Sequence, residues 1–352
     1  MLSDDERAAL QEETDYRWRG TKSLWFTVFV VSFAACLQGM DESVINGANL
    51  FYPTQFGIGG DSRRDTMIEG FVNSAPYLCA GLFSCWMTGP LNNRLGRRGT
   101  IFVGSLLSGI GCIWSACTNT WWHLVIARFW IGLGIGPNSA SAPILAAEVA
   151  PPAIRGALCM QWQVWTAFGI MLGTVTSLIF KGVADPVGSS ITGLNWRLML
   201  GSAVLPALFV CPLVLFCPES PRWLLSKGRH QDAWASIQKY RRHDILAARE
   251  LLTMATLIDI EKEMSANNKR NAFSAMLLVP RNRRAVLASS IVMFGQQFCG
   301  VNAIAYFSST IFINAGASQT KALLGSFGYG LLNWVFALPA FFTIDTFGRR
   351  NL

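Results

Sequence analysis

The feature that most limits how this chain can fold is the length of its apolar blocks. The blocks run for roughly 20 residues each, which is the length that a helix needs to cross a lipid bilayer. Charged residues make up only 14% of the 352 residues, whereas a soluble domain carries about 25%. Eight membrane-spanning helices are predicted, over residues 24–46, 69–90, 100–118, 121–145, 156–180, 196–217, 287–313 and 322–344. The sequence therefore predicts an all-α integral membrane protein, and no removable signal peptide is expected at its start.

Basic residues are distributed unevenly among the segments that connect these spans. When alternate segments are assigned to opposite sides of the membrane, 23 of the 29 Lys and Arg residues fall on the side of the N-terminus and five fall on the other. Because positively charged segments stay in the cytoplasm, the N-terminus is expected to be cytoplasmic. The net charge of +8 is thus explained by topology, and no nucleic-acid partner is expected.

The composition divides the chain into four parts. These are a cytoplasmic tail over residues 1–23, a six-helix bundle over residues 24–217, a linker of short amphipathic helices over residues 218–284, and two further helices over residues 285–352. The phrase Gly-Arg-Arg follows a span twice, at residues 96–98 and 348–350, which indicates two related halves. We expect the C-terminal bundle to be represented by only about two helices, so that the chain is C-terminally truncated.

Two charged residues fall at predicted membrane depth, where a charge is costly unless it is paired or faces water. Asp41 follows the apolar run of the first span, and Arg128 lies in the fourth. Each is the expected partner of the other, and an arginine that moves away from a buried carboxyl changes the proton affinity of that carboxyl. The pair therefore predicts proton coupling, with a static structural ion pair as the alternative.

The fifth span carries a stripe of polar and small residues. One arc of its helical wheel holds Gln163, Thr166, Ile170, Gly173, Thr174 and Ser177. A polar stripe between apolar flanks is typical of a helix that lines a hydrated cavity. The alternative is that the Ser and Thr hydroxyls bond to the backbone of their own helix.

The seventh span is interrupted by glycine and is rich in amides. Gln296 and Gly300 share one helical face, whereas Asn302 and Tyr306 share another. A helix broken near Gly300 brings both sets to one cavity, as discontinuous transporter helices do. Amides both donate and accept hydrogen bonds, which suits a neutral polyhydroxylated ligand, and Asn333 in the eighth span adds one more amide.

The sequence gives no indication of an enzyme. The nine Cys residues lie in or beside apolar spans and show no metal-ligand spacing. We find no nucleophile–base arrangement and no phosphate loop that follows a strand. No catalytic residue, metal ion or cofactor is therefore expected.

Several phrases together resemble one known family. They are GMDESVING at 39–47, NNRLGRR at 92–98, ARF at 127–129 with GLGIG at 132–136, EVAPPAIRG at 148–156, NWRLM at 195–199, PESPRWL at 218–224, QQFCGVN at 296–302 and DTFGRR at 345–350. The order and spacing of PESPR and QQxxGxN are highly specific. Over residues 24–352 the chain is similar to the sugar porter family of the major facilitator superfamily, and its motifs look most like those of the fungal branch.

The resemblance implies the major facilitator fold and alternating access of a small neutral sugar or polyol around a central site. In the family, sugar hydroxyls are bound by the positions that match Gln163, Gln296, Gln297, Asn302 and Asn333. An outer aromatic gate matches Tyr306 and Phe307. The position of Asp41 is acidic in the proton symporters of the family, which favours symport with Arg128 as its partner.

The resemblance also implies a charged cluster on the cytoplasmic side. The positions that match this salt-bridge gate are Arg97, Glu148, Arg155, Glu219, Arg222 and Arg349. In the family this cluster locks the outward-open state. Single exposed pairs are worth little, but a network that forms in only one state can favour that state.

Three functions stay open on the sequence alone. The leading one is a proton-coupled sugar or polyol transporter, surrounded by lipid and expected in the plasma membrane. The second is a transporter-like receptor, which binds the sugar without moving it. The third is an inactive fragment, because part of the cavity wall is absent. The sequence identifies neither the sugar nor the oligomeric state.

Overall fold

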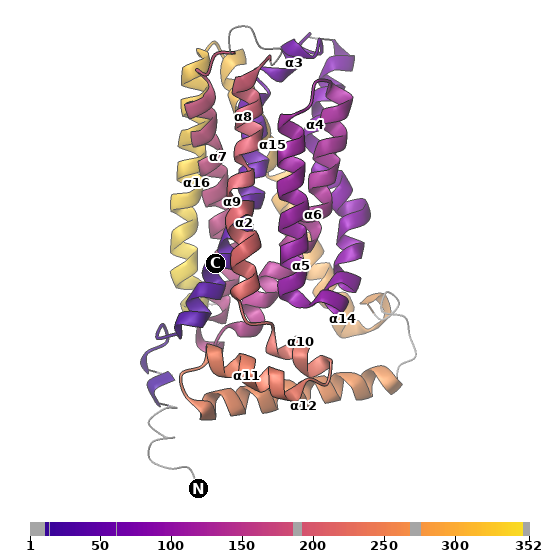
Figure 1. Ribbon diagram of the computed structural model, residues 1–352, viewed down its shortest axis with the longest axis vertical. Coiled ribbons are helices and arrows are strands. Elements are labelled where there is room, and N and C mark those ends of the chain that lie inside the picture. Colours follow the sequence, from indigo (N-terminus) through magenta and orange to yellow (C-terminus); the bar gives the residue numbers. More distant parts are fainter. Residues whose placement is uncertain (1–10, 14, 61, 186–191, 268–275, 348–352) are drawn as a thin grey trace.

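The computed structural model describes residues 11–13, 15–60, 62–185, 192–267 and 276–347. These residues form an elongated bundle of long helices, with α3 at one end and α10, α11 and α12 lying across the other (Figure 1). None of them forms a β-strand. The helices are α2 Lys22–Ala48, α3 Tyr52–Gln55, α4 Arg63–Cys79, η1 Ala80–Ser84, α5 Cys85–Ala116, α6 Trp121–Val149, η2 Pro152–Ile154, α7 Arg155–Phe180, α8 Leu194–Ser202, α9 Val204–Phe216, α10 Pro221–Ser226, α11 His230–Tyr240, α12 Asp244–Asn267, α14 Pro280–Phe298, α15 Val301–Asn314 and α16 Gln319–Phe347.

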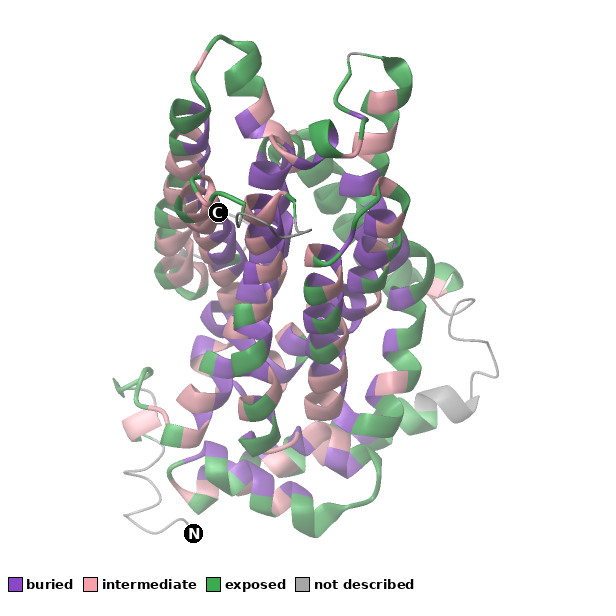
Figure 2. Cartoon of the chain, turned by 45° about the horizontal axis from the view of Figure 1, so that its top comes forward, coloured by how far each residue is buried: buried purple, intermediate pink, exposed green. Residues whose placement is uncertain are grey.

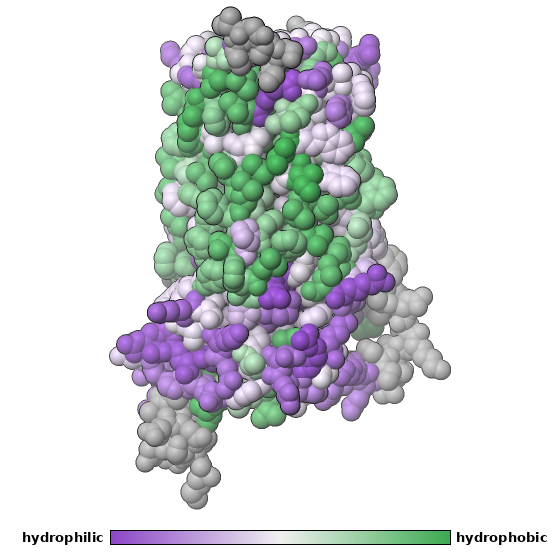
Figure 3. All heavy atoms as spheres, in the orientation of Figure 1, coloured by the Kyte–Doolittle hydropathy of each residue, from purple (hydrophilic) through white to green (hydrophobic). Residues whose placement is uncertain are grey.

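On the face seen in Figure 3, an apolar band covers the bundle between its two polar ends. The helical stretches that are long and apolar enough to cross a membrane are Lys22–Ala48, Arg63–Ala116, Pro152–Phe180, Leu194–Phe216, Pro280–Asn314 and Gln319–Thr346. The 54-residue stretch Arg63–Ala116 contains two of the predicted spans. α6 has 29 residues but is outside this set. The division into six plus two spans stays a prediction.

A sharp bend at Gly96 separates the two spans of the Arg63–Ala116 stretch. Gly96 has φ 77°, a left-handed conformation that side chains disfavour. A Cβ at this position would lie 2.3 Å from a carboxylate oxygen of Glu219. That carboxylate accepts hydrogen bonds from the backbone N–H groups of Arg97 at 3.0 Å and Arg98 at 3.2 Å. The first Gly-Arg-Arg phrase therefore forms a turn that is held by the start of the polar linker.

α2 and α7 pack against each other along a seam of small residues. A Cβ on Gly39 would lie 2.0 Å from the carbonyl oxygen of Thr166, and one on Gly169 would lie 2.3 Å from the carbonyl oxygen of Cys36. Farther along, a Cβ on Gly173 would lie 1.9 Å from the Ser43 hydroxyl. Small residues let two helix backbones approach this closely. Buried residues gather along such inner faces of the bundle (Figure 2).

The seam corrects the prediction for the polar stripe of α7. Of that stripe, Thr166, Ile170, Gly173, Thr174 and Ser177 are buried rather than lining an open cavity. The hydroxyls of Thr166, Thr174 and Ser177 bond to carbonyls of their own helix, which was the alternative interpretation. Gln163 is the member of the stripe that stays exposed. A helical wheel shows which residues share a face, but it does not show what packs against that face.

The seventh predicted span is broken at Gly300, as its glycine and amide pattern predicted. α14 ends at Phe298 and α15 begins at Val301, with Gly300 between them at φ 76°. α15 packs on α2 and α16, and α16 packs on α7. α14 has no buried residue. The break therefore separates a packed half of this span from an unpacked one.

The segment before α2 contacts distant parts of the chain. Glu12 forms ion pairs with Arg242 at 2.7 Å and with His243 at 3.1 Å in the region between α11 and α12. The Trp18 ring lies 5.4 Å from the ring of Phe341 on α16, between centroids. This short segment thus joins the polar linker to the last helix.

Candidate functional site

The predicted charge pair lies between α2 and α6 in the middle of the bundle. Arg128 Nη1 is 3.8 Å from Asp41 Oδ1, and the two side chains are 0% and 7% exposed. Arg128 Nε donates to the carbonyl of Val72 on α4 at 3.1 Å. Its two η nitrogens have no hydrogen-bond partner among the described residues. The guanidinium therefore has unused donors next to a carboxylate that it holds only loosely.

A polar contact joins α2 to α15, and sequence reasoning missed it. Asn46 Nδ2 donates to Ser308 Oγ at 2.8 Å, and its Oδ1 accepts from the backbone N–H of Ser309 at 3.1 Å. One turn later, Asn49 Nδ2 donates to the carbonyl of Tyr306 at 3.1 Å. Ser326 on α16 lies within hydrogen-bond distance of both serine hydroxyls. Two asparagines three residues apart at the end of an apolar span were the available signal.

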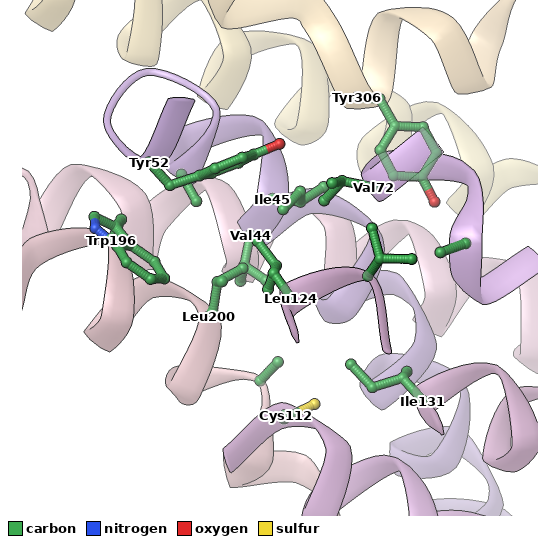
Figure 4. Close-up of a cluster of buried hydrophobic side chains, with 14 of the residues drawn as sticks. Val44, Ile45, Tyr52, Val72, Cys112, Leu124, Ile131, Trp196, Leu200 and Tyr306 are labelled. Carbon is green, nitrogen blue, oxygen red and sulfur yellow. The ribbon is translucent and has the colours of Figure 1, made fainter. Parts of the chain in front are cut away.

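The predicted gate residues lie beside this contact. Tyr306 is buried and joins an apolar cluster with Val44, Ile45 and Val72 (Figure 4). Its ring meets the Tyr77 ring edge-on, with centroids 6.4 Å apart. Phe307 is partly buried against the same cluster. Both residues therefore pack against α2 and α4, and their role as a gate stays a prediction.

The five predicted sugar-binding amides lie on four helices. Gln163 on α7 and both Gln296 and Gln297 on α14 are exposed, while Asn302 on α15 and Asn333 on α16 are half-buried. The structure brings two of them together, since Asn302 Nδ2 donates to Gln297 Oε1 at 2.9 Å across the break at Gly300. Among the described residues, no further hydrogen bond joins members of this set. Exposed amides keep their donors and acceptors free for a ligand.

The predicted salt-bridge cluster is smaller than expected. Arg97 binds Glu148 through two hydrogen bonds, from Nε at 3.1 Å and from Nη2 at 3.0 Å. Glu219 binds the backbone beside Arg97 rather than an arginine side chain. Bidentate Arg–carboxylate pairs are the strong ones among such contacts. The centre of the cluster is therefore the pair between Arg97, directly after the Gly96 bend of α5, and Glu148 at the end of α6.

The other arginines of that prediction bind partners other than Glu148. Arg222 on α10 lines the same cleft as Arg97 and Glu148, but it pairs with Glu261 on α12 at 2.8 Å. Arg155 Nη2 donates to the carbonyl of Ala150 at 3.4 Å. The structure pairs neither arginine directly with Glu148, and the full cluster stays a prediction. Arg349 lies outside the described residues.

A second contact between distant segments joins the start of α7 to α16. Asp345 on α16 accepts a hydrogen bond from the backbone N–H of Ala157 at 2.8 Å. Gly156 makes this approach possible, since a Cβ there would lie 2.0 Å from the Asp345 carboxylate. Asp345 belongs to the second of the two repeated phrases, but sequence reasoning assigned it no contact. α16 is thus fastened to the first turn of α7.

The chain matches a family model over most of its length. Residues 27–352 match the model described as "Sugar (and other) transporter". The glucose transporter GlcP of Staphylococcus epidermidis is 30% identical over 332 residues, which are 93% of this chain and 68% of that protein. The myo-inositol transporter FST1 of Gibberella moniliformis is 31% identical over 93% of this chain and 55% of its own length. The galactose-proton symporter of Escherichia coli is 30% identical over 94% of this chain and 67% of its own length.

Solved structures show the same arrangement of helices. The proton:xylose symporter XylE bound to 6-bromo-6-deoxy-D-glucose has a TM-score of 0.80 and 26% identity, over 93% of this chain and 70% of that one. The partially occluded inward-open form of XylE from Escherichia coli has a TM-score of 0.76 and 25% identity, over 93% of this chain and 74% of that one. The chain thus spans between about half and three quarters of the length of these proteins.

Proposed function

Because this chain belongs to the sugar porter family of the major facilitator superfamily, we propose that it carries a neutral sugar or polyol across a membrane by alternating access, coupled to protons. Members of this family are integral membrane transporters and not enzymes. The observation that carries the proposal is the buried Asp41–Arg128 pair, at 3.8 Å. A static structural pair is expected to be closely hydrogen-bonded, whereas this one is loose and leaves two η nitrogens unused.

Coupling follows from what a proton on Asp41 does to the pair. A neutral carboxyl no longer attracts the guanidinium, so Arg128 can turn its unused donors to another acceptor. Asp41 lies five residues before Asn46, whose amide holds α15. Protonation at Asp41 and sugar at the centre can then favour the same conformation of α2 and α15, which is the linkage that symport requires.

The two ends of the bundle supply the alternating contacts. At the end with α3, the contact is made by Asn46 and Asn49 with α15. At the end with α10, α11 and α12, it is made by Asp345 with the start of α7. From the distribution of Lys and Arg we place the α10–α12 end in the cytoplasm. Opening one contact while the other holds exposes the centre to one side at a time.

The substrate class rests on the amides. Sugar hydroxyls need partners that both donate and accept, and Gln163, Gln296, Gln297, Asn302 and Asn333 provide such groups. The relatives include proteins named as glucose, myo-inositol and galactose-proton transporters. A neutral sugar or polyol fits both observations, while the individual substrate is a matter for measurement.

Uptake of labelled hexoses, pentoses, disaccharides and inositol, with external pH recorded, tests the proposal. The host is a cell without sugar carriers of its own, and it expresses either the 352-residue chain or a version extended by the part of a relative that the chain does not span. Sugar uptake with proton entry is the expected result. Sugar binding at the surface without uptake by either version contradicts transport and favours a receptor.

A further inference from the structure

Asp41 is followed by a second buried carboxyl that the proposed mechanism does not use. Asp41 and Glu42 are 5% and 6% exposed. Because consecutive side chains on a helix point about 100° apart, the two carboxyls face different neighbours. Asp41 faces Arg128 on α6. Glu42 faces Tyr77 on α4, whose hydroxyl donates to Glu42 Oε2 at 3.1 Å.

The charges around these two carboxyls do not balance. The groups within electrostatic range of Glu42 are Asp41 on α2, Tyr77 on α4, Tyr306 on α15 and Tyr329 on α16, and Arg128 lies beyond Asp41. Arg128 is the cation of this group, and the structure pairs it with Asp41. A carboxylate without a cation is strongly disfavoured in an apolar core. One of the two carboxyls must therefore hold a proton, and the geometry selects Glu42.

Glu42 is also connected to the gate. The Tyr77 hydroxyl that binds it belongs to the ring that meets Tyr306 edge-on. Tyr306 in turn accepts a hydrogen bond from Asn49 through its carbonyl. A change at Glu42 thus reaches α15 through one tyrosine pair.

We propose that Glu42 is a second proton-binding carboxyl of this protein, and that Tyr77 connects its protonation to the contact between α2 and α15. The assignment of the proton depends only on the geometry. Its part in coupling rests on the proposed function. Asp41, paired with Arg128, and Glu42, bound by Tyr77, are then two proton-binding carboxyls on consecutive residues.

Infrared spectroscopy of the purified chain in lipid vesicles tests the proton assignment, because a protonated carboxyl has a C=O stretching band that a carboxylate lacks. We expect Glu42→Gln to lose a band that is present at neutral pH. Asp65→Asn, at the first turn of α4, is the control and keeps that band. A Glu42→Gln spectrum that matches the unmodified chain overturns the proposal.

Tyr77→Phe provides a second test that keeps the carboxyl and the ring. Without the hydroxyl, the C=O group of Glu42 loses its hydrogen-bond donor, so its band should shift to higher frequency. Tyr52→Phe removes a hydroxyl that has no hydrogen-bond partner in the described part of the chain, and it should leave the band in place. An unshifted band in Tyr77→Phe contradicts the connection through Tyr77.

Sugar uptake measured on the same variants separates the two proposals. Loss of the band in Glu42→Gln, together with uptake that no longer responds to external pH, supports both. Loss of the band when the unmodified protein takes up no sugar supports the proton site and rejects the proposed transport. An unchanged band with normal proton-coupled uptake rejects the role of Glu42 and leaves the proposed transport standing.

Discussion

At the scale of single residues, the distance between Asp41 and Arg128 is informative. At 3.8 Å the contact is longer than a charge-assisted hydrogen bond of about 2.7–2.9 Å. Arg128 is positioned instead by its bond to the carbonyl of Val72. The arginine can therefore keep its place while its electrostatic partner changes, which a proton-dependent contact needs.

Asp41→Asn should abolish proton-driven accumulation while sugar exchange without a proton gradient continues. The amide has the shape of a protonated aspartate but cannot release a proton. We expect accumulation in vesicles to fall by about tenfold or more, corresponding to about 1.4 kcal/mol or more of coupling. Asp65→Asn serves as the matched control. Full accumulation by Asp41→Asn would remove Asp41 from the coupling site.

Gln163→Ala should weaken sugar binding without lowering the amount of protein at the surface. The side chain is exposed, so its loss does not disturb packing, and one lost hydrogen bond costs about 1 kcal/mol. The dissociation constant should rise by roughly fivefold to tenfold. Gln161→Ala, on the other side of the same helix, is the control. Equal affinities for the two variants would show that Gln163 is not in the site.

At the scale of helices, the seam between α2 and α7 gives a stability prediction. Gly39→Ala places a methyl group 2.0 Å from a backbone oxygen of Thr166, and backbone atoms cannot turn aside as a flexible side chain does. We expect a loss of about 1–3 kcal/mol, measured as a lower temperature of thermal unfolding in detergent. Gly89→Ala, where nothing lies within 4 Å, should leave that temperature unchanged. Equal unfolding temperatures would contradict the tight seam.

Sequence reasoning located individual features better than it located their neighbours. The break at Gly300 could be predicted because glycine interrupts helices. The pairing of Asp41 with Arg128 could be predicted because each is a charge at membrane depth that needs a partner. The stripe of α7 was misassigned because its small residues suit a helix contact as well as a cavity. The pairing of Arg222 with Glu261 was missed because Glu261 lies on a linker helix whose placement depends on tertiary packing. Asn46 and Ser308 are 262 residues apart, a separation that no local pattern spans.

At the scale of the whole molecule, the segment before α2 should respond to pH. The hydrogen bond with His243 lowers the pKa of the Glu12 carboxyl, and the charge of Arg242 adds to this effect. Because the pKa of Glu12 is lower in the folded protein, its carboxylate stabilises the attachment of this segment to the linker at every pH above the unfolded pKa of about 4.3. The attachment weakens as the pH falls through the lower, folded pKa, because the carboxylate then becomes protonated.

Cleavage of this segment by an acid-active protease measures that attachment. We expect cleavage near Tyr16 to accelerate as the pH falls below about 4, and Glu12→Gln to be cleaved quickly throughout. Glu263→Gln at the exposed end of α12 is the control. Equal cleavage of Glu12→Gln and the unmodified chain at the least acidic pH at which the protease works, above about 4.3, would contradict the role of Glu12.

The seam between α2 and α7 also decides where the bundle can bend. Two helix backbones that are already in contact cannot slide past each other, so α2 and α7 move together as one rigid body. The amide and hydroxyl groups between α2 and α15 can instead exchange partners with water at little cost, and they form the joint. α2 has 27 residues and a length of about 40 Å. A rotation of about 10° at the joint therefore moves the far end of α2 by about 7 Å. A small rearrangement of hydroxyl groups at the α2–α15 contact can thus open the bundle at the end that carries α10, α11 and α12.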